Sequence, residues 1–267
     1  MIADDTRIYE TRHGQMLGLA GDRYVSRSLE LYGEFSKGEW DLFAQFVKPG
    51  WTVVEVGSNI GTHTVPLAQA CAPAQLYAFE PQQRVFQLMC ANLALNGVLN
   101  AMALPDACGD HEGHVIVPSV NYAATGNFGG ISVHGEDEDV SGVKTRLRTI
   151  DSLELPECHF IKIDVEGFEP SVLRGAARTI ERRRPILYVE NDRPANQQEV
   201  ISLIHGMGYV LYWHCPALYD PGNFRNNPDN VFAGIASVNL FCLPREGDSR
   251  VANAPEIDPN DWRSPVR

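Results

Sequence analysis

The strongest constraint on the fold is an alternation of two hydrophobic periods between residues 51 and 243. Short apolar runs, typical of buried strands, are separated by stretches whose apolar residues recur every three or four positions, as in helices. The expected strands are 51–56, 76–79, 99–104, 159–165, 185–190, 209–213 and 235–243. The expected helices between them are 61–70, 83–95, 170–180 and 196–207. Strands that alternate with helices predict an α/β protein with a mostly parallel sheet and helices on both faces.

The N-terminal residues 1–47 precede this pattern and are expected to form a cap segment. They are polar and irregular up to about residue 36, with only weak strand signals. A helix is predicted at 38–47, where Ser36 and Glu39 have the spacing of a capping box. The main domain is therefore expected to span 48–245.

Two insertions and a tail depart from the alternation. Residues 113–149 predict a β-hairpin, whose Gly-rich and acidic tip is long enough to serve as a lid. Residues 216–232 are dense in Pro, Gly and Asn and predict a second long loop. Residues 246–267 are polar, contain three prolines and predict a flexible tail.

Composition and charge limit the partners of the chain. With 22 Lys and Arg against 34 Asp and Glu, the 267 residues have a formal net charge of −12. Nucleic acids and anionic membrane surfaces bind clustered cations, so this balance argues against both as partners. The six cysteines form no CxxC pair, the first residues lack the features of a signal peptide, and no apolar run reaches the roughly 20 residues of a membrane span. These features predict a cytoplasmic protein without a membrane span.

A glycine-containing loop, EVGSNIG at 55–61, follows the first predicted strand and opens a helix. Gly57 and Gly61 allow a tight turn and the close approach of a ligand. Asn59 stands between them, and Asn is the residue type that best tolerates the left-handed conformation after glycine. We expect a branched side chain at Gly57 to abolish ligand binding while the fold survives.

The same loop indicates the kind of ligand. Its spacing departs from the GxGxxG of dinucleotide sites, because Ser58 and Asn59 follow the first glycine. Glu55 precedes the loop, where a carboxylate repels a pyrophosphate but suits a cationic amino-acid group. This combination favours a ligand with an ammonium and a sulfonium, namely S-adenosylmethionine.

Acids also follow the next two predicted strands. Glu80, after 76–79, is placed to accept hydrogen bonds from both hydroxyls of a ribose. Asp106, with Ala107 beside it after 99–104, is placed to accept from the amino group of an adenine, although turn chemistry explains an Asp there equally well.

On these motifs the chain resembles the FkbM-type family of class I S-adenosylmethionine-dependent methyltransferases. The resemblance rests on FIKIDVEGFE at 160–169, on VKTRLRTIDSL before it and on PILYVEND after it, and covers roughly residues 38–245. It implies a Rossmann-like class I methyltransferase fold and transfer of a methyl group to a hydroxyl oxygen. The acceptors it implies are sugars of glycans and natural-product small molecules.

Methyl transfer to an alcohol needs a group that removes the hydroxyl proton. Asp164 is the first candidate for this base, and Glu190, at the end of strand 185–190, is its expected neighbour in the sheet. Two carboxylates so placed share the role when one raises the pKa of the other. Alternatively, Asp164, Glu190 and Asn191 present oxygens to Mg²⁺. Direct base catalysis is preferred, and no metal ligand is assigned.

Other acids and histidines receive a structural interpretation. Glu166 and Glu169 belong to the turn after Asp164, and Glu169 is expected to stabilise the N-terminus of the following helix. The eight histidines show no HxxxH or HExxH spacing, which argues against a zinc site. His63 and His134 are more often packing or surface residues than groups that face an acceptor.

Two other functions stay open. A nucleic-acid methyltransferase is opposed by the net charge and by DVEG at 164–167, where such enzymes have an Asn-Pro-Pro-aromatic turn. A non-catalytic partner subunit would bind S-adenosylmethionine and keep its function in the variant Asp164→Asn.

Overall fold

The structure is a computed structural model that describes residues 5–136, 138–247, 251 and 254–266. Within that part of the chain, seven strands form one central sheet. Their spatial order is β12 (Tyr209–His214), β13 (Asn239–Pro244), β11 (Ile186–Glu190), β10 (Phe160–Ile163), β3 (Val53–Val56), β4 (Leu76–Phe79) and β5 (Ala101–Leu104). All neighbours are parallel except β13, which is antiparallel to both β11 and β12. The predicted mostly parallel sheet is confirmed.

The strand order changes direction at β3. From β3 the chain adds β4 and then β5 on one side, whereas β10 and β11 lie on the other side. In such sheets ligands bind outside the carboxyl ends of the strands at this switch. The ends of β3 and β10 are therefore where a site is expected.

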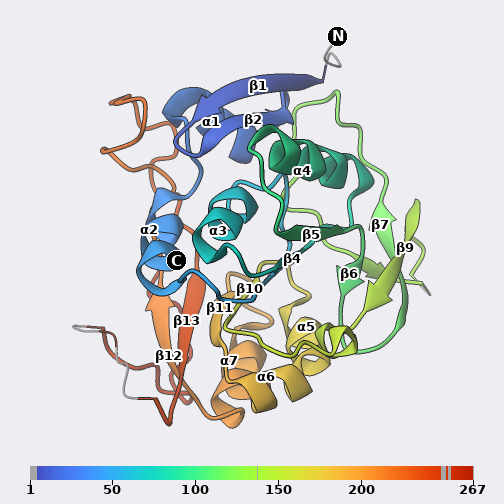
Figure 1. The fold of residues 1–267 in the computed structure, drawn as a ribbon, viewed down its shortest axis with the longest axis vertical. Coiled ribbons are helices and arrows are strands. Elements are labelled where there is room, and N and C mark those ends of the chain that lie inside the picture. The colour runs from blue at the N-terminus through green and yellow to red at the C-terminus, as the bar shows by residue number, and fades with distance from the viewer. Residues whose placement is uncertain (1–4, 137, 248–250, 252–253, 267) are drawn as a thin grey trace.

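Helices cover both faces of the sheet, as predicted (Figure 1). The helices α2 (Lys37–Phe46), α3 (Thr64–Cys71) and α4 (Gln83–Leu95) pack with Val53 and Phe160 in one core. The helices α5 (Glu169–Gly175), α6 (Ala177–Arg183) and α7 (Gln197–Gly206) pack with Val54 and Ile161 in the other. Successive residues of each strand thus enter opposite cores, because side chains alternate along a strand. The single helix predicted at 170–180 is divided at Ala176 into α5 and α6.

The N-terminal segment is more regular than its sequence indicates. A hairpin of β1 (Thr6–Thr11) and β2 (Gly14–Leu19) is followed by α1 (Val25–Tyr32), which was not predicted. The helix buries Val25, Leu29 and Tyr32, which have helical spacing, but with 8 residues the pattern is short and lies in a polar segment.

Ser36 is the N-cap residue of α2, as expected of a capping box, but the predicted capping-box hydrogen bonds are not formed. Ser36 has a left-handed φ of 45° and makes no side-chain cap bond to the helix backbone. Its hydroxyl instead donates to the carboxylate of Glu39 at 2.8 Å. Glu39 is thereby held at the start of α2, with only 4% of its surface exposed.

The insertion at 113–149 is the predicted hairpin, formed by β7 (Gly113–Pro118) and β9 (Gly142–Arg148). With the two-residue strands β6 (Ala107–Cys108) and β8 (His134–Gly135) they make a second sheet in the order β6-β9-β7-β8. The tip reaches back to the N-terminal segment, where the amides of Gly126 and Arg23 donate to the carbonyls of Gly21 and Gly126. A short 3-10 helix (Ile150–Leu153) leads from β9 towards β10.

The loop before β13 and the end of the chain both contact the domain. Tyr32 of α1 donates its hydroxyl to the carbonyl of Asp229 at 2.8 Å and packs with Leu218 and Phe232. Further on, where a flexible tail is expected, the amide of Ile257 donates to the carbonyl of Leu211 at 2.8 Å. In the described residues no helix is long and apolar enough to cross a membrane.

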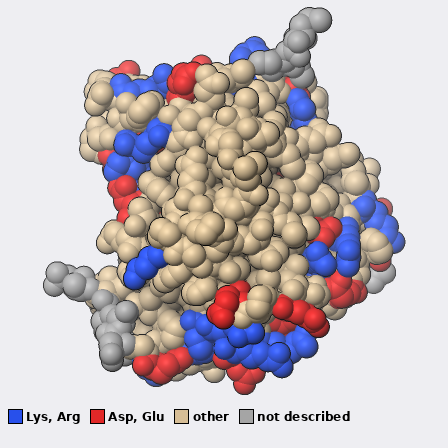
Figure 2. Space-filling view, viewed as in Figure 1, with Lys and Arg blue, Asp and Glu red and all other residues tan. Residues whose placement is uncertain are grey.

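Charged side chains are unevenly spread on the face shown in Figure 2. They gather along the lower edge, around α5 and α6, while the area over α3 is free of them. At that edge cations pair with acids, as Arg178 does with Asp151 at 3.4 Å and Arg174 does with Glu199.

Candidate active site

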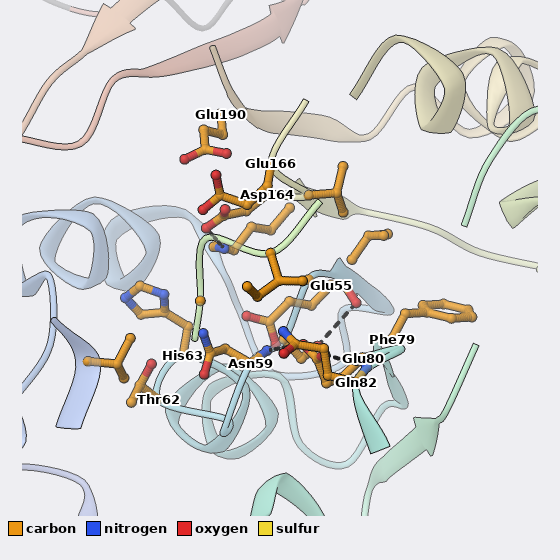
Figure 3. A pocket seen from close by; sticks show the side chains of 18 of the residues that line it. Glu55, Asn59, Thr62, His63, Phe79, Glu80, Gln82, Asp164, Glu166 and Glu190 are labelled. Carbon is orange, nitrogen blue, oxygen red and sulfur yellow. Dashed lines mark hydrogen bonds and ion pairs between the residues drawn. The ribbon is translucent and has the colours of Figure 1, made fainter. Parts of the chain in front are cut away.

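A cavity of about 250 Å³ lies at the ends of β3, β4, β10 and β11, next to the switch in strand order. It brings together the predicted site residues from five separate segments (Figure 3). The predicted residues that line it are Glu55, Gly57, Ser58, Asn59, Glu80, Asp106, Ala107, Asp164 and Glu190. Gly61 does not line it and instead makes the turn before α3, with a φ of 89°.

The loop after β3 has the predicted left-handed turns. Gly57 has a φ of 83° and Asn59 a φ of 51°. The amides of Gly57 and Ser58 both donate to the carbonyl of Phe79, at 3.0 and 2.9 Å, which fixes the loop to the end of β4.

The reason for glycine at position 57 differs from the prediction. A Cβ there would lie 1.7 Å from the backbone carbonyl oxygen of Asp164, at the end of the neighbouring strand. The glycine therefore allows two strand ends to approach, and a side chain would displace backbone rather than only obstruct a ligand. This contact opposes the expectation that a branched substitution leaves the fold intact.

Glu55 is almost fully buried, with 1% of its surface exposed. No described residue forms a hydrogen bond with Oε2 of Glu55. Burial raises the pKa of this carboxyl to about 7, although the ammonium of Lys162 opposes the shift. An unpartnered carboxylate oxygen in a cavity is a site for a cationic or hydrogen-bond-donating ligand.

Glu80 ties the loop to the second strand. Its Oε2 accepts from the amide of Asn59 and its Oε1 accepts from the amide of Gln82, both at 2.9 Å. Only 4% of the surface of Glu80 is exposed, and this burial raises its pKa to about 7. Each oxygen keeps a further lone pair, so the carboxylate is able to accept from a diol as well.

Asp106 and Ala107 also line the cavity. Asp106 pairs with Arg148 of β9 at 3.4 Å, and Ala107 begins β6. The inserted hairpin thus fixes the acid that was predicted to contact an adenine.

The other half of the cavity contains a buried lysine and a group of carboxylates. Lys162 points from the middle of β10 and is 2% exposed, and its ammonium donates to Oδ2 of Asp164 at 2.8 Å. Burial disfavours charge on both groups, but their attraction outweighs it, so the pKa of Lys162 is raised and the pKa of Asp164 is lowered. Asp164 is therefore ionised and a weak base by itself.

Two further carboxylates converge on Asp164 of this ion pair. One oxygen each from Asp164, Glu166 and Glu190 lies within 4.8 Å of the other two, and Figure 3 shows the three groups pointing toward one another. Burial and the neighbouring charge of Asp164 raise the pKa of Glu190 well above its ordinary value. The same causes raise the pKa of Glu166 to about 7, while Arg193 pairs with it and opposes the shift.

The structure changes the set of acids that the sequence suggested. Glu166 was predicted to be structural, yet it lines the cavity, whereas Asn191 is buried and does not line it. Glu169 has the predicted structural role, because its Oε1 accepts from the amides of Val165 and Gly167 at 3.1 and 3.0 Å. The Asp-x-Glu spacing across a turn was the signal that could have identified Glu166.

Three further lining residues do not stand at the carboxyl ends of the parallel strands. His63 is 5% exposed and its Nδ1 lies 4.0 Å from Oε2 of Glu39, which also lines the cavity. Burial, together with the charge of Lys162, lowers the pKa of His63 to about 3, so the ring is neutral. Asn239, at the start of β13, faces the same cavity. No local signal in the sequence places Glu39 or Asn239 here, since they lie far from the other residues along the chain.

The family model described as "Methyltransferase FkbM domain" matches residues 55–211, more than half of the chain. A comparison with curated protein sequences gave no match.

Among solved structures, the chain is similar to a methyltransferase FkbM from Methylobacillus flagellatus KT, with 15% identity and a TM-score of 0.47. That similarity covers 75% of this chain and 50% of the other, so the chain spans half the length of that protein. It is also similar to M. jannaschii TYW2 in complex with AdoMet, with 14% identity, coverage of 91% and 87%, and a TM-score of 0.46. A precorrin-6y C5,15-methyltransferase from Geobacter metallireducens GS-15 shows 7% identity, coverage of 77% and 84%, and a TM-score of 0.47.

Proposed function

The chain belongs to the methyltransferase FkbM family, and from this premise we propose that it is an S-adenosylmethionine-dependent O-methyltransferase. The proposed acceptor is a hydroxyl of a sugar, a glycan or a natural-product small molecule. The observation that carries the proposal is a single cavity in which the loop after β3 and Glu80 adjoin the carboxylates of Asp164 and Glu190.

The residues around the loop fit the proposed cofactor. S-adenosylmethionine, when bound, supplies an activated methyl group on a sulfonium. Oε2 of Glu55, which has no hydrogen-bond partner among the described residues, suits the ammonium of S-adenosylmethionine. Glu80 is able to accept from the ribose hydroxyls, and Asp106 with Ala107 would hold the adenine.

Glu190 is the proposed base. Its pKa is raised by burial and by Asp164, so it binds a proton more strongly than an ordinary carboxylate. With S-adenosylmethionine bound, Glu190 would take the proton of the acceptor hydroxyl as its oxygen accepts the methyl group, and the cofactor would leave as a neutral thioether. Asp164, fixed by Lys162, supports the negative surroundings that make Glu190 basic.

Direct base catalysis is preferred to assistance by Mg²⁺. Asp164 and Glu166 have the right oxygens for such an ion, but each is already paired with a cation, Lys162 and Arg193 respectively. A nucleic-acid acceptor is not favoured either. Its phosphates need clustered cations, whereas the chain has a net charge of −12 and pairs its cations with acids on the face of Figure 2.

A product screen tests this proposal. Purified protein and S-adenosylmethionine are incubated with fractionated glycans, nucleotide sugars and hydroxylated metabolites, with and without a chelator, and the products are analysed by mass spectrometry. The proposal expects a product heavier by one methylene in both arms. A product formed only without chelator contradicts the direct base mechanism. Absence of cofactor binding contradicts the function itself.

A further inference from the structure

The half of the cavity beyond the cofactor residues is strongly acidic. Glu39, Asp164, Glu166 and Glu190 line it, and Lys162 is the only Lys or Arg among the described residues of the whole lining. The ammonium of Lys162 is already bound to Asp164 at 2.8 Å and is 2% exposed. An anionic acceptor would therefore meet the ionised Asp164 and no available cation, and its own charge would further oppose ionisation of Glu166 and Glu190.

A second observation points to the kind of ligand that this half accommodates. In the described part of the chain, two buried polar atoms beside the carboxylates lack a hydrogen-bond partner, Nδ2 of Asn239 and Nε2 of His63. Their residues are 3% and 5% exposed and line the same cavity. Buried polar atoms are seldom left unpaired without reason, so both await a polar group.

Asn239 lies beside the proposed base. It is the register partner of Glu190 across β11 and β13, and directly opposed residues project from the same face of a sheet. The amide is a donor, and Oε2 of Glu190 is an acceptor with no partner among the residues the structure describes. A hydroxyl satisfies both at once, because it accepts one hydrogen bond and donates another.

Apolar side chains also line the acidic half of the cavity, which we call the chamber. Tyr24 and Phe35 come from the segment around α1, and Leu218 and Ile235 come from the loop before β13. These two segments are tied together by hydrogen bonds, such as that from the amide of Val231 to the hydroxyl of Tyr32 at 3.0 Å. All four residues lie outside the span 55–211 that matches the family model.

We propose that this chamber selects an acceptor without phosphate or carboxylate groups, whose reacting hydroxyl is bound between Asn239 and Glu190. The inference rests on the proposed function and specifies its acceptor as a neutral or amine-bearing sugar or similar polyol. The chamber's apolar residues pack against the carbon faces of the ring, and Asn239 donates to the hydroxyl oxygen while Glu190 accepts its proton.

The test uses four probes with one ring shape: methyl glucoside, glucosamine, glucose 6-phosphate and glucuronate. Binding to the full chain saturated with S-adenosylhomocysteine is measured by saturation-transfer NMR. The proposal expects the first two to bind at least about tenfold more tightly than the last two. It is overturned if the phosphate or the carboxylate binds equally well, or if none of the four binds.

A variant separates the role of Asn239 from a general effect of charge. Asn239→Asp keeps the side-chain shape but removes the donor, and it should weaken binding of methyl glucoside by about tenfold or more. Asn260→Asp, at an exposed position, adds the same charge and should have no effect. Affinity for S-adenosylhomocysteine, which should stay within about twofold in both variants, reports that the fold is intact. Unchanged glucoside binding in Asn239→Asp would contradict the role of Asn239 as hydrogen-bond donor to the acceptor. Absence of cofactor binding by the wild-type chain would contradict the proposed function instead.

Discussion

The close approach of two strand ends at Gly57 makes a stability prediction that depends on the fold alone. A Cβ at this position would lie 1.7 Å from the carbonyl oxygen of Asp164, and the residue has a φ of 83°. A left-handed conformation costs a residue other than glycine about 1–2 kcal/mol. Overpacking of this kind costs about 1–3 kcal/mol more. We therefore expect Gly57→Ala to lower the free energy of unfolding by about 2–5 kcal/mol.

Gly50 is the matched control for this prediction. Its φ of 88° is close to that of Gly57, but no described heavy atom lies within 4 Å of the Cβ that an alanine would add. Gly50→Ala should therefore cost only the conformational part, about 1–2 kcal/mol. Both substitutions restrict the unfolded chain equally, so the difference between them isolates the clash.

Urea unfolding followed by circular dichroism measures both variants. With a slope near 3 kcal/mol per molar urea, the midpoint of Gly57→Ala should fall about 0.3–1 M below that of Gly50→Ala. Equal midpoints would show that the strand ends are farther apart than the structure places them, and they would refute the reason given for this glycine.

The remaining predictions concern the charged residues of the cavity. Glu190→Gln should lower turnover by about 10²–10⁴-fold with little change in cofactor affinity, because it removes the proposed base. Steady-state kinetics measure this effect, and near-normal turnover would show that Glu190 is not the base. Wild-type turnover should rise with pH through the raised pKa of Glu190, since only the ionised form accepts a proton; a profile that falls with pH over that range contradicts the assignment. Because burial raises the pKa of Glu80 to about 7, folding favours its neutral form, so the stability it contributes is present below pH 4.5 and is lost as the pH rises through 7. Glu80→Gln should flatten this part of the curve in thermal unfolding, and an unaltered curve opposes the prediction. Lys162→Met should destabilise the fold by about 3 kcal/mol, because it leaves Asp164 without its cation, and an unchanged urea midpoint argues against that pair.

The sequence predicted one half of the site better than the other, for a physical reason. Glu80 follows a predicted strand, and Glu55, Asp164 and Glu190 lie at or near the end of one. Parallel strands end at the same edge of their sheet. The positions of the predicted strands alone therefore predict that these acids lie close together. The same logic predicted the β7–β9 hairpin, since its two arms are local in sequence.

Residues that reach the cavity from elsewhere could not be predicted in this way. Glu39 enters from α2, where its spacing to Ser36 imitates a capping box, and Asn239 enters on an antiparallel strand next to β11. The role of Gly57 was also hidden, because the atom it avoids belongs to Asp164, more than a hundred residues later. Such long-range contacts depend on packing, which local patterns do not record.

In the proposed function, this chain moves a methyl group from S-adenosylmethionine to a hydroxyl oxygen. The most direct measurement uses S-adenosylmethionine with a ¹³C-labelled methyl group, a panel of neutral and amine-bearing sugars, and NMR detection of the product. The carbon shift of the label identifies the atom to which it is bonded. The wild-type chain should form a product with the label on oxygen, and Glu190→Gln should not form it. A label on nitrogen or carbon, or a cofactor that does not bind, would contradict the proposed function.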